Sequence, residues 1–336
     1  MHIGKSYTLP EFIDWTRRRG YVLLLLAFVS VAAYQLLGLH WLAFPWPVAA
    51  LLGTAASFIV GFKNVQTYQR SMEAQQVWTA IGVLSRYWGL ICRDFPKDGK
   101  GFEPLVRRHL AWLTVLRYGA REPRVWESSS SRSNVEYQKR NYRVIEREVP
   151  LENELRRLLP QEDVPQVLAA QDKSGWLLSA QSRAIRELYL NQDLVVLHHT
   201  EMQKTLKDLL DQQGRVDRIK NFPYPRQYAA IHRIFVWCFA AILPLCLVRE
   251  FERLNESVGG LLAGHMAWFA VPFGVLVAWL YLALDQVGES TENPFEGNAN
   301  DVPISRICGT LEYELRGLLG DADVPMPPPQ DQAIIL

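Results

Sequence analysis

The chain has 336 residues, of which 49% are hydrophobic and 21% charged, and its formal net charge is +1. A balance this close to neutral provides no basic field for nucleic acid, so no nucleic-acid partner is expected. The cysteines Cys92, Cys238, Cys246 and Cys308 show no C-x-x-C spacing, which argues against a disulfide framework or a thiol metal site.

The first predicted elements are two membrane spans. No Asp, Glu, Lys or Arg occurs between Tyr21 and Phe62, and a spanning helix needs about 20 mostly apolar residues. Gly38, with Pro45 and Pro47 after it, breaks the stretch in two. The sequence therefore predicts one crossing from about Tyr21 to Leu37 and a second from about Pro47 to Phe62.

A polar, helix-patterned region follows, from residue 63 to 227. The second span has no stop signal at Phe62, and the next proline is Pro96. Apolar residues recur at helical spacing, at Val77, Ile81, Leu84 and Trp88. The pattern predicts one helix of ~70 Å, at 1.5 Å per residue, that leaves the membrane and enters the cytoplasm.

Further amphipathic helices are expected at Arg107 to Tyr118, Leu151 to Leu159 and about Trp176 to Asp211. Gly119 to Val149, which contains four consecutive serines, is typical of an exposed loop or a partly ordered insertion. No alternating pattern that would favour a sheet is present.

Two more spans are predicted near the other end. One covers residues 228 to 248, and the other lies within the uncharged run from Ser257 to Leu284. The proline-rich tail from Pro325 to Leu336 is expected to be extended or disordered. The fold class is thus an all-α membrane protein with four transmembrane helices and a large helical cytoplasmic region. Its parts are residues 1–62, 63–227, 228–284 and 285–336.

Charge placement predicts the orientation. Arg17, Arg18 and Arg19 precede the first span, whereas the loop from Gly38 to Trp46 has no Lys or Arg. The positive-inside rule therefore places the N-terminus, and after four spans the C-terminus, in the cytoplasm. We expect a multi-pass protein of the cell's inner (plasma) membrane, with the lipid bilayer as its partner.

No catalytic motif is apparent: G-x-G-x-x-G, P-loop, H-E-x-x-H and G-x-S-x-G patterns are all missing. The pair His198 and His199 would point about 100° apart on a helix and so chelate poorly. A solvated or subunit-facing pair is favoured over a metal site. The sequence predicts neither an enzyme nor a bound metal or cofactor.

Three segments carry a family resemblance. They are Gly61-Phe62-Lys63-Asn64 with Tyr68, Arg70, Glu73 and Trp78; Arg218-Ile219 with Pro223 and Pro225; and Glu292-Asn293-Pro294-Phe295 with Asn300-Asp301-Val302-Pro303. In this order and spacing the chain resembles the bestrophins, and their bacterial branch in particular. The resemblance covers nearly the whole chain and agrees with four spans.

The resemblance implies a homopentameric ion channel with one central pore. It places a narrow neck at Thr54, Phe58 and Phe62 and a second, cytoplasmic aperture at Leu197. Spacing separately puts the three neck residues on one helix face, and apolar rings can gate by dewetting. Without the resemblance, lipid-facing or helix-packing roles for the phenylalanines and a core role for Leu197 would be favoured.

Animal relatives that resemble this chain carry a calcium clasp after the Pro-Phe motif. Here Phe295 is followed by only two acids, Glu296 and Asp301, whereas a tight Ca²⁺ site takes six to eight oxygens. Calcium binding is therefore doubtful, and no cofactor is expected. Glu292, Asn293, Pro294, Phe295 and Asp301 are expected to be structural, with the acids holding the segment against basic residues of the cytoplasmic helices.

The function implied is a channel for monovalent ions, with chloride as the family default. The neck residues carry no charge and so do not determine the sign of the ion. A monovalent cation (sodium) channel and a membrane scaffold without conduction stay open as alternatives.

Overall fold

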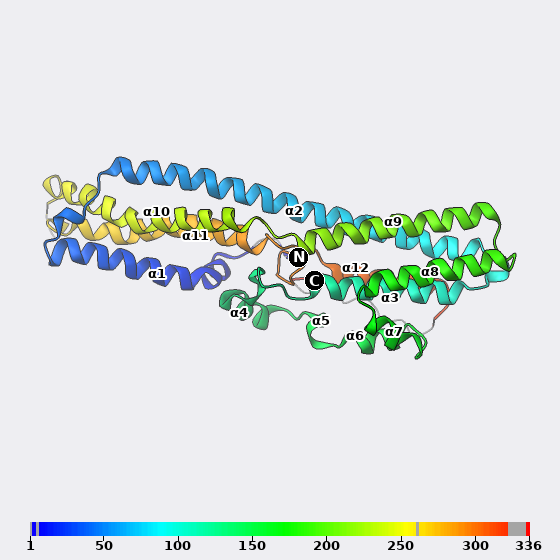
Figure 1. Cartoon of the computed structure of the whole chain (residues 1–336). Helices are drawn as coiled ribbons and strands as arrows, with labels where there is room; N and C mark the ends of the chain where they lie inside the picture. The colour runs from blue at the N-terminus through cyan, green and yellow to red at the C-terminus, as the bar shows by residue number, and fades with distance from the viewer. Residues whose placement is uncertain (1, 5–6, 260–261, 322–333) are drawn as a thin grey trace.

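The molecule is a long helical rod in which a membrane half and a cytoplasmic half share one helix (Figure 1). The computed structural model describes residues 2–4, 7–259, 262–321 and 334–336. In these ranges four helices are long and apolar enough to cross a membrane, and strand pairing is confined to one bridge between His2 and Ile334. The all-α fold class predicted from the sequence is confirmed.

Helices α1, α2, α10 and α11 form the membrane half. Their bounds are α1 Leu9–Leu36, α2 Trp46–Asp94, α10 Arg226–Arg253 and α11 Ala270–Ser290. The turn after α1 contains Gly38 at φ +65°, a left-handed conformation that glycine adopts without strain. Pro47 lies in the first turn of α2, where a missing N–H costs no hydrogen bond.

Helix α2 runs without interruption through both halves, as predicted. Its 49 residues correspond to ~73 Å at 1.5 Å per residue. Its first part packs against α10 and α11, and its last part against α9 and α12. The predicted neck residues and residues of the cytoplasmic core therefore lie on one continuous helix.

The cytoplasmic half packs four further helices around the end of α2 (Figure 1). These are α3 Phe102–Arg121, α8 Lys173–Leu190, α9 Val196–Asn221 and α12 Ile304–Leu319. Trp78, Trp88 and Trp112 are fully buried between them. A large aromatic core of this kind is typical of a domain that folds in water.

The segment from Gly119 to Val149, predicted as an exposed loop or a partly ordered insertion, is ordered. The loop alternative was wrong because serines and mixed charges are also compatible with short helices that dock onto another segment. The segment contains α4 Arg132–Asn141 and α5 Ile145–Glu148, and Glu127, Ser128 and Ser129 are buried. Two short helices follow it, α6 Leu151–Arg156 and α7 Asp163–Ala169.

Two other boundaries differ from the prediction. The helix expected from Trp176 to Asp211 is broken between α8 and α9, where Gln192 adopts φ +63°. The fourth span, predicted within the run from Ser257 to Leu284, begins near Met266 and continues to Ser290. Gly264, at φ +83°, lies in a turn before it. An uncharged sequence is therefore not helical throughout.

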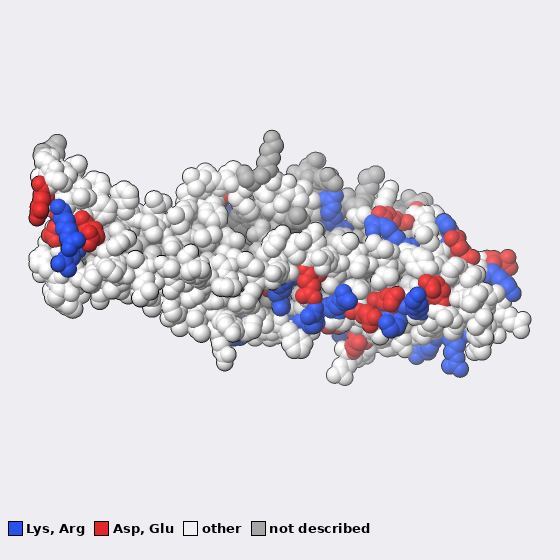
Figure 2. Space-filling view, turned by 90° about the horizontal axis from the view of Figure 1, so that it is seen from above, with Lys and Arg blue, Asp and Glu red and all other residues white. Residues whose placement is uncertain are grey.

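Charge is absent from a broad band of the membrane half. Figure 2 shows Lys, Arg, Asp and Glu at one tip and over the cytoplasmic half, with an uncharged zone between them. The tip corresponds to the end of α10, where Arg253 pairs with Glu250 at 3.1 Å. The uncharged zone is the expected position of the hydrocarbon.

The predicted tail, Pro325 to Leu336, lies largely outside the described residues. Its last three residues are described and are docked: the backbone N–H of Arg306 donates to the carbonyl of Leu336 at 2.8 Å, and Ile334 is buried. The end of the chain is therefore held beside α12.

Candidate functional site: the exposed face of α2

One face of α2 in the membrane half presents the predicted neck residues. This face carries Thr54, Phe58 and Phe62, which follow one another at intervals of about one helical turn. The side chains of Phe58 and Phe62 are 65% and 67% exposed. Thr54 is also exposed, and its hydroxyl donates to the carbonyl of Ala50 at 2.8 Å. The structure thus leaves an uncovered apolar face on one chain.

The opposite face of α2 explains why these side chains point outward. Gly53, Ala56 and Val60 are buried against α10 and α11. A Cβ added at Gly53 would lie 2.9 Å from Cε2 of Phe239, so the helices are in close contact there. Small residues allow the helix backbones to come this close. Helices in lipid depend on such contact, because lipid tails are themselves apolar and do not drive apolar side chains together.

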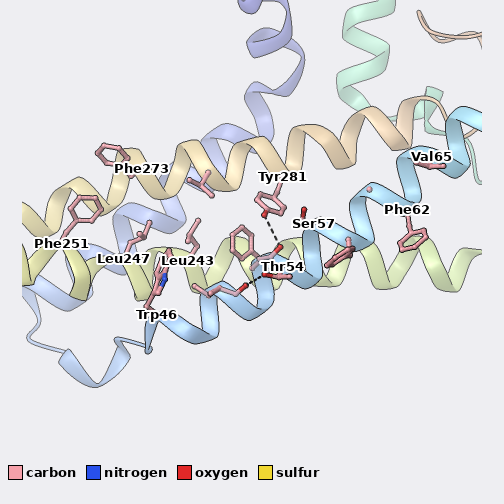
Figure 3. Close-up of a pocket in the computed structure, with 17 residues that line it drawn as sticks. Trp46, Thr54, Ser57, Phe62, Val65, Leu243, Leu247, Phe251, Phe273 and Tyr281 are labelled. Carbon is pink, nitrogen blue, oxygen red and sulfur yellow. Dashed lines mark hydrogen bonds between the residues drawn. The ribbon is translucent and has the colours of Figure 1, made fainter.

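A groove of about 830 Å³ borders the neck face between α2, α10 and α11 (Figure 3). Trp46 and Val65 lie near its two ends, and Phe273 and Leu243 form part of its wall. The Tyr281 hydroxyl donates to the carbonyl of Gly53 at 3.2 Å and fixes that wall. The lining is mostly apolar, with Thr54, Ser57 and Tyr281 as its polar members.

A buried ion pair follows directly after the last predicted neck residue on α2. Nζ of Lys63, the residue after Phe62, lies 2.8 Å from Oδ1 of Asp285, and both side chains are buried. Arg19 contacts Asp285 at 3.4 Å and Glu289 at 2.6 Å. The sequence analysis missed this cluster, although a signal was present: Lys63 and Asp285 are the first charges after two uncharged runs.

Leu197 lies at the opposite end of the molecule, in the first turn of α9, and is 77% exposed. Its histidine neighbours pack separately: His198 stacks on Phe95 with ring centres 4.0 Å apart, and His199 lies 4.8 Å from the ring of Tyr189. In the described part of the chain, no group of three or more His, Cys, Asp and Glu side chains is placed to hold a metal. The position of Leu197 at a helix tip makes it available to a neighbouring copy or to solvent.

The motif after the last span forms a buried hub. The ring of Phe295 meets that of Trp78 edge-on at 6.4 Å. Asp301 accepts the backbone N–H groups of Gly297 at 2.6 Å and Asn298 at 3.1 Å, and its carboxylate lies 3.4 Å from Arg121 of α3. Asp301 thus holds the motif against a cytoplasmic helix in the expected way.

The other members of the motif have local roles. Glu292 pairs with Arg226 at the start of α10 at 3.5 Å. The carbonyl of Asn293 accepts the N–H of Glu296 at 3.4 Å, and that of Pro294 accepts the N–H of Val302 at 3.1 Å. These bonds fold the segment into a compact turn below α11.

Glu296 is the residue that the sequence analysis did not assign. Its carboxylate accepts the backbone N–H of Ser128 at 2.7 Å, the Ser128 hydroxyl at 2.6 Å and the N–H of Ser129 at 3.3 Å. Burial raises the pKa of Glu296, and it raises that of Asp301 to about 6. Both acids are therefore engaged by donors of the chain itself, and Glu296 is what docks the segment from Gly119 to Val149.

Comparison with known sequences identifies the family. The model of the bacterial/fungal bestrophin proteins matches residues 16–317. The chain belongs to the bestrophin family. The resemblance in the three sequence segments is thereby confirmed.

Curated bestrophin relatives include proteins named "voltage-dependent anion channel-forming protein". YneE of Salmonella typhi is 24% identical over 308 residues, which cover 91% of this chain and 86% of the relative. The Ralstonia nicotianae protein RSc3414 is 22% identical over 321 residues, covering 94% and 90%.

Solved bestrophin structures have the same fold. A bacterial bestrophin homolog from Klebsiella pneumoniae matches with a TM-score of 0.74 and 22% identity, over 91% of this chain and 99% of the other. Its L177T variant matches with a TM-score of 0.73. The arrangement of membrane and cytoplasmic helices is therefore the bestrophin arrangement.

Proposed function

We propose that five copies of this bestrophin form an ion channel in the inner membrane that passes monovalent anions, with chloride as the representative ion. The observation that carries the proposal is the exposed face of α2. This helix runs from the membrane half into the cytoplasmic core and presents Thr54, Phe58 and Phe62 on an exposed face. Membership of a family whose curated relatives are named as channel-forming supports conduction over catalysis.

The pentamer gives the exposed face a role. A single α2 cannot enclose a path for ions, whereas a ring of five would place each neck residue in a ring of five side chains. The groove between α2, α10 and α11 would then receive a neighbouring copy. The two phenylalanine rings would form a short, dry neck that gates by dewetting.

Leu197 is proposed as the second constriction. It lies in the first turn of α9 and is exposed at the cytoplasmic tip. Five leucines there would form an apolar aperture that selects by size.

The sign of the ion follows from the relatives rather than from the neck. The curated relatives are named as anion channel-forming, while Thr54, Phe58 and Phe62 carry no charge. We place the N- and C-termini in the cytoplasm, because Arg17, Arg18 and Arg19 precede α1. We propose no calcium requirement, since Glu296 and Oδ2 of Asp301 accept hydrogen bonds from the chain.

Two measurements test the proposal. Native mass measurement of the purified protein should give five chains, and planar bilayers in asymmetric KCl should give currents that reverse near the chloride equilibrium potential. Reversal near the potassium potential would replace the anion assignment by the cation alternative. A folded pentamer without current would favour a scaffold, and a folded monomer or dimer would remove the central pore.

A further inference from the structure

A small aromatic cavity lies where the membrane and cytoplasmic halves meet, away from α2. It has a volume of about 170 Å³ and is formed by the start of α1, the segment around α4, the end of α11 and the turn after it. Figure 1 shows α4 beside the start of α1, in agreement with their contacts. A cavity of about 150 Å³ accommodates a molecule the size of benzene, so this one is large enough for a small organic ligand.

The wall of the cavity is unusually rich in electron-rich rings. Tyr7, Tyr137, Tyr142 and Trp15 line it together with Phe12. None of the described wall residues is charged. Val287 is the one aliphatic side chain among them that is larger than alanine. The cytoplasmic core, by contrast, mixes its aromatic residues with many leucines, isoleucines and valines.

The rings have a geometry suited to a cation. Tyr137 and Tyr142 are inclined at 63° with their centres 6.4 Å apart, and Tyr7 lies 6.4 Å from Tyr137 at 41°. A cation placed between ring centres 6.4 Å apart can lie within about 6 Å of both, which is the range of cation–π attraction.

Polar contacts fix the wall and supply oxygen atoms. Trp15 Nε1 donates to Oδ1 of Asn134 at 3.1 Å, and Nδ2 of Asn134 donates to the carbonyl of Ser128 at 3.0 Å. Asn298 on the opposite side contacts the carboxylate of Glu296. The cage is therefore preorganised, and a carboxyl group lies directly behind its wall.

We propose that this cavity binds a small organic ammonium ion, of the trimethylammonium class, at the cytoplasmic surface of the membrane. Such a group occurs in free solutes such as choline and in the headgroup of phosphatidylcholine. The rings attract its diffuse positive charge, and a quaternary ammonium group, which has no N–H to donate, suits a wall without charged acceptors. The site is independent of the proposed conduction pathway.

The test compares the binding of two ligands that have the same shape but differ in charge. Binding of choline to the purified full-length protein is measured by calorimetry, beside 3,3-dimethylbutan-1-ol, its uncharged isostere. We expect saturable choline binding and at least about tenfold weaker binding of the alcohol. Equal binding of the two would show a simple apolar cavity, and no choline binding would show that the cavity takes no ammonium ion; either result overturns the proposal.

Variants locate the site. Tyr137→Leu and Tyr142→Leu should each weaken choline binding about 5- to 30-fold, because each removes one ring of the cage. Tyr137→Phe keeps the ring and should bind choline within about threefold of the wild type. Tyr313→Leu on α12 is the matched control, since this tyrosine is 42% exposed and lies outside the cavity. Unchanged choline affinity in both leucine variants would place the binding site elsewhere and overturn the assignment.

Nanodiscs distinguish the two sources of the group. A headgroup site should lose choline binding in phosphatidylcholine discs and keep it in phosphatidylglycerol discs. A free-solute site should bind choline equally in both.

Discussion

The two halves of α2 are packed by different means. In the membrane half its buried residues are small, with Gly53, Ala49 and Ala56 facing the partner helices. In the cytoplasmic half they are large, with Trp78 and Trp88 both fully buried. One continuous helix therefore packs through small residues in the membrane half and through large aromatic residues in the cytoplasmic half.

The difference follows from which packing interactions are favourable in water and which are favourable in lipid. In water, burying an aromatic side chain is favourable because apolar area is removed from water. In lipid that gain is missing, so the spans rely on close van der Waals contact between backbones. This leaves the large phenylalanines of the membrane half free to face outward rather than inward.

The largest effect should come from emptying the cytoplasmic core. Trp112 is fully buried, and its Nε1 donates to Oε1 of Gln213 at 2.9 Å. Trp112→Ala should lower the free energy of unfolding by about 3–5 kcal/mol, seen as a clear fall in melting temperature in detergent. Trp41→Ala is the control, because Trp41 is 78% exposed; similar losses in both variants would contradict the comparison.

A pH effect should also be confined to the cytoplasmic half. Burial raises the pKa of Asp301 from its ordinary 3.8 to about 6, so the folded state holds this proton more tightly than the unfolded state. The stability that protonation contributes is complete below pH about 4 and is lost as the pH rises through about 6. Relative to Asp301→Asn, the wild type should lose roughly 2–3 kcal/mol from pH 4 to pH 8.

Asp321 provides a control of opposite sign for this pH effect. Its hydrogen bond from Arg316 lowers its pKa, so its contribution is present at neutral pH and is lost on acidification. Melting temperatures of Asp301→Asn and Asp321→Asn against the wild type should therefore diverge with pH. Parallel trends would contradict the assignment.

Close packing in the membrane half should be sensitive to a single methyl group. Gly53→Ala places a carbon 2.9 Å from the ring of Phe239, which is held against Tyr281 with ring centres 4.7 Å apart. We expect a loss of about 1–2 kcal/mol. A Cβ added at Gly61 would meet no atom within 4 Å, so Gly61→Ala should be neutral or slightly stabilising. Melting curves of the two variants test this difference.

The proposed neck predicts a change of current without a change of stability. Phe58→Ala and Phe62→Ala should each raise conductance or open probability by a few fold, because a smaller ring is wider and wets more readily. Phe28→Ala, on the exposed side of α1, is the control. Single-channel currents equal to wild type in both neck variants would place the constriction elsewhere.

The smallest effect is expected at Leu197. Leu197→Ala should shift relative permeability among ions of increasing radius by a factor of about two, with little effect on assembly. Reversal potentials for a series of halides and larger anions measure this. Loss of assembly with unchanged permeability ratios would show that Leu197 serves packing between subunits.

Composition predicted the spans and the long second helix because both depend on local properties. The uncharged run after Tyr21 and the lack of proline before Pro96 are visible in the chain. The loop containing Gly264 was missed because hydropathy does not separate an uncharged loop at the membrane surface from a helix inside it. The break at Gln192 was missed because it lacks glycine or proline.

The candidate site was predictable in part. The spacing of Thr54, Phe58 and Phe62 gives a common helix face, but it does not say which face of α2 the other spans cover. The docking of Ser128 on Glu296 joins residues far apart in the sequence. The aromatic cavity likewise joins Tyr7 to Tyr137, and no local pattern reveals such long-range contacts.

Because α2 is unbroken, a tilt at one of its ends displaces the other end. From Phe62 to Asp94 the helix extends ~48 Å at 1.5 Å per residue, and it contains no proline that would serve as a hinge. A tilt of about 5° at the neck therefore moves its cytoplasmic end by about 4 Å, unless the surrounding helices move with it. Small rearrangements at either end are in this way communicated mechanically to the other.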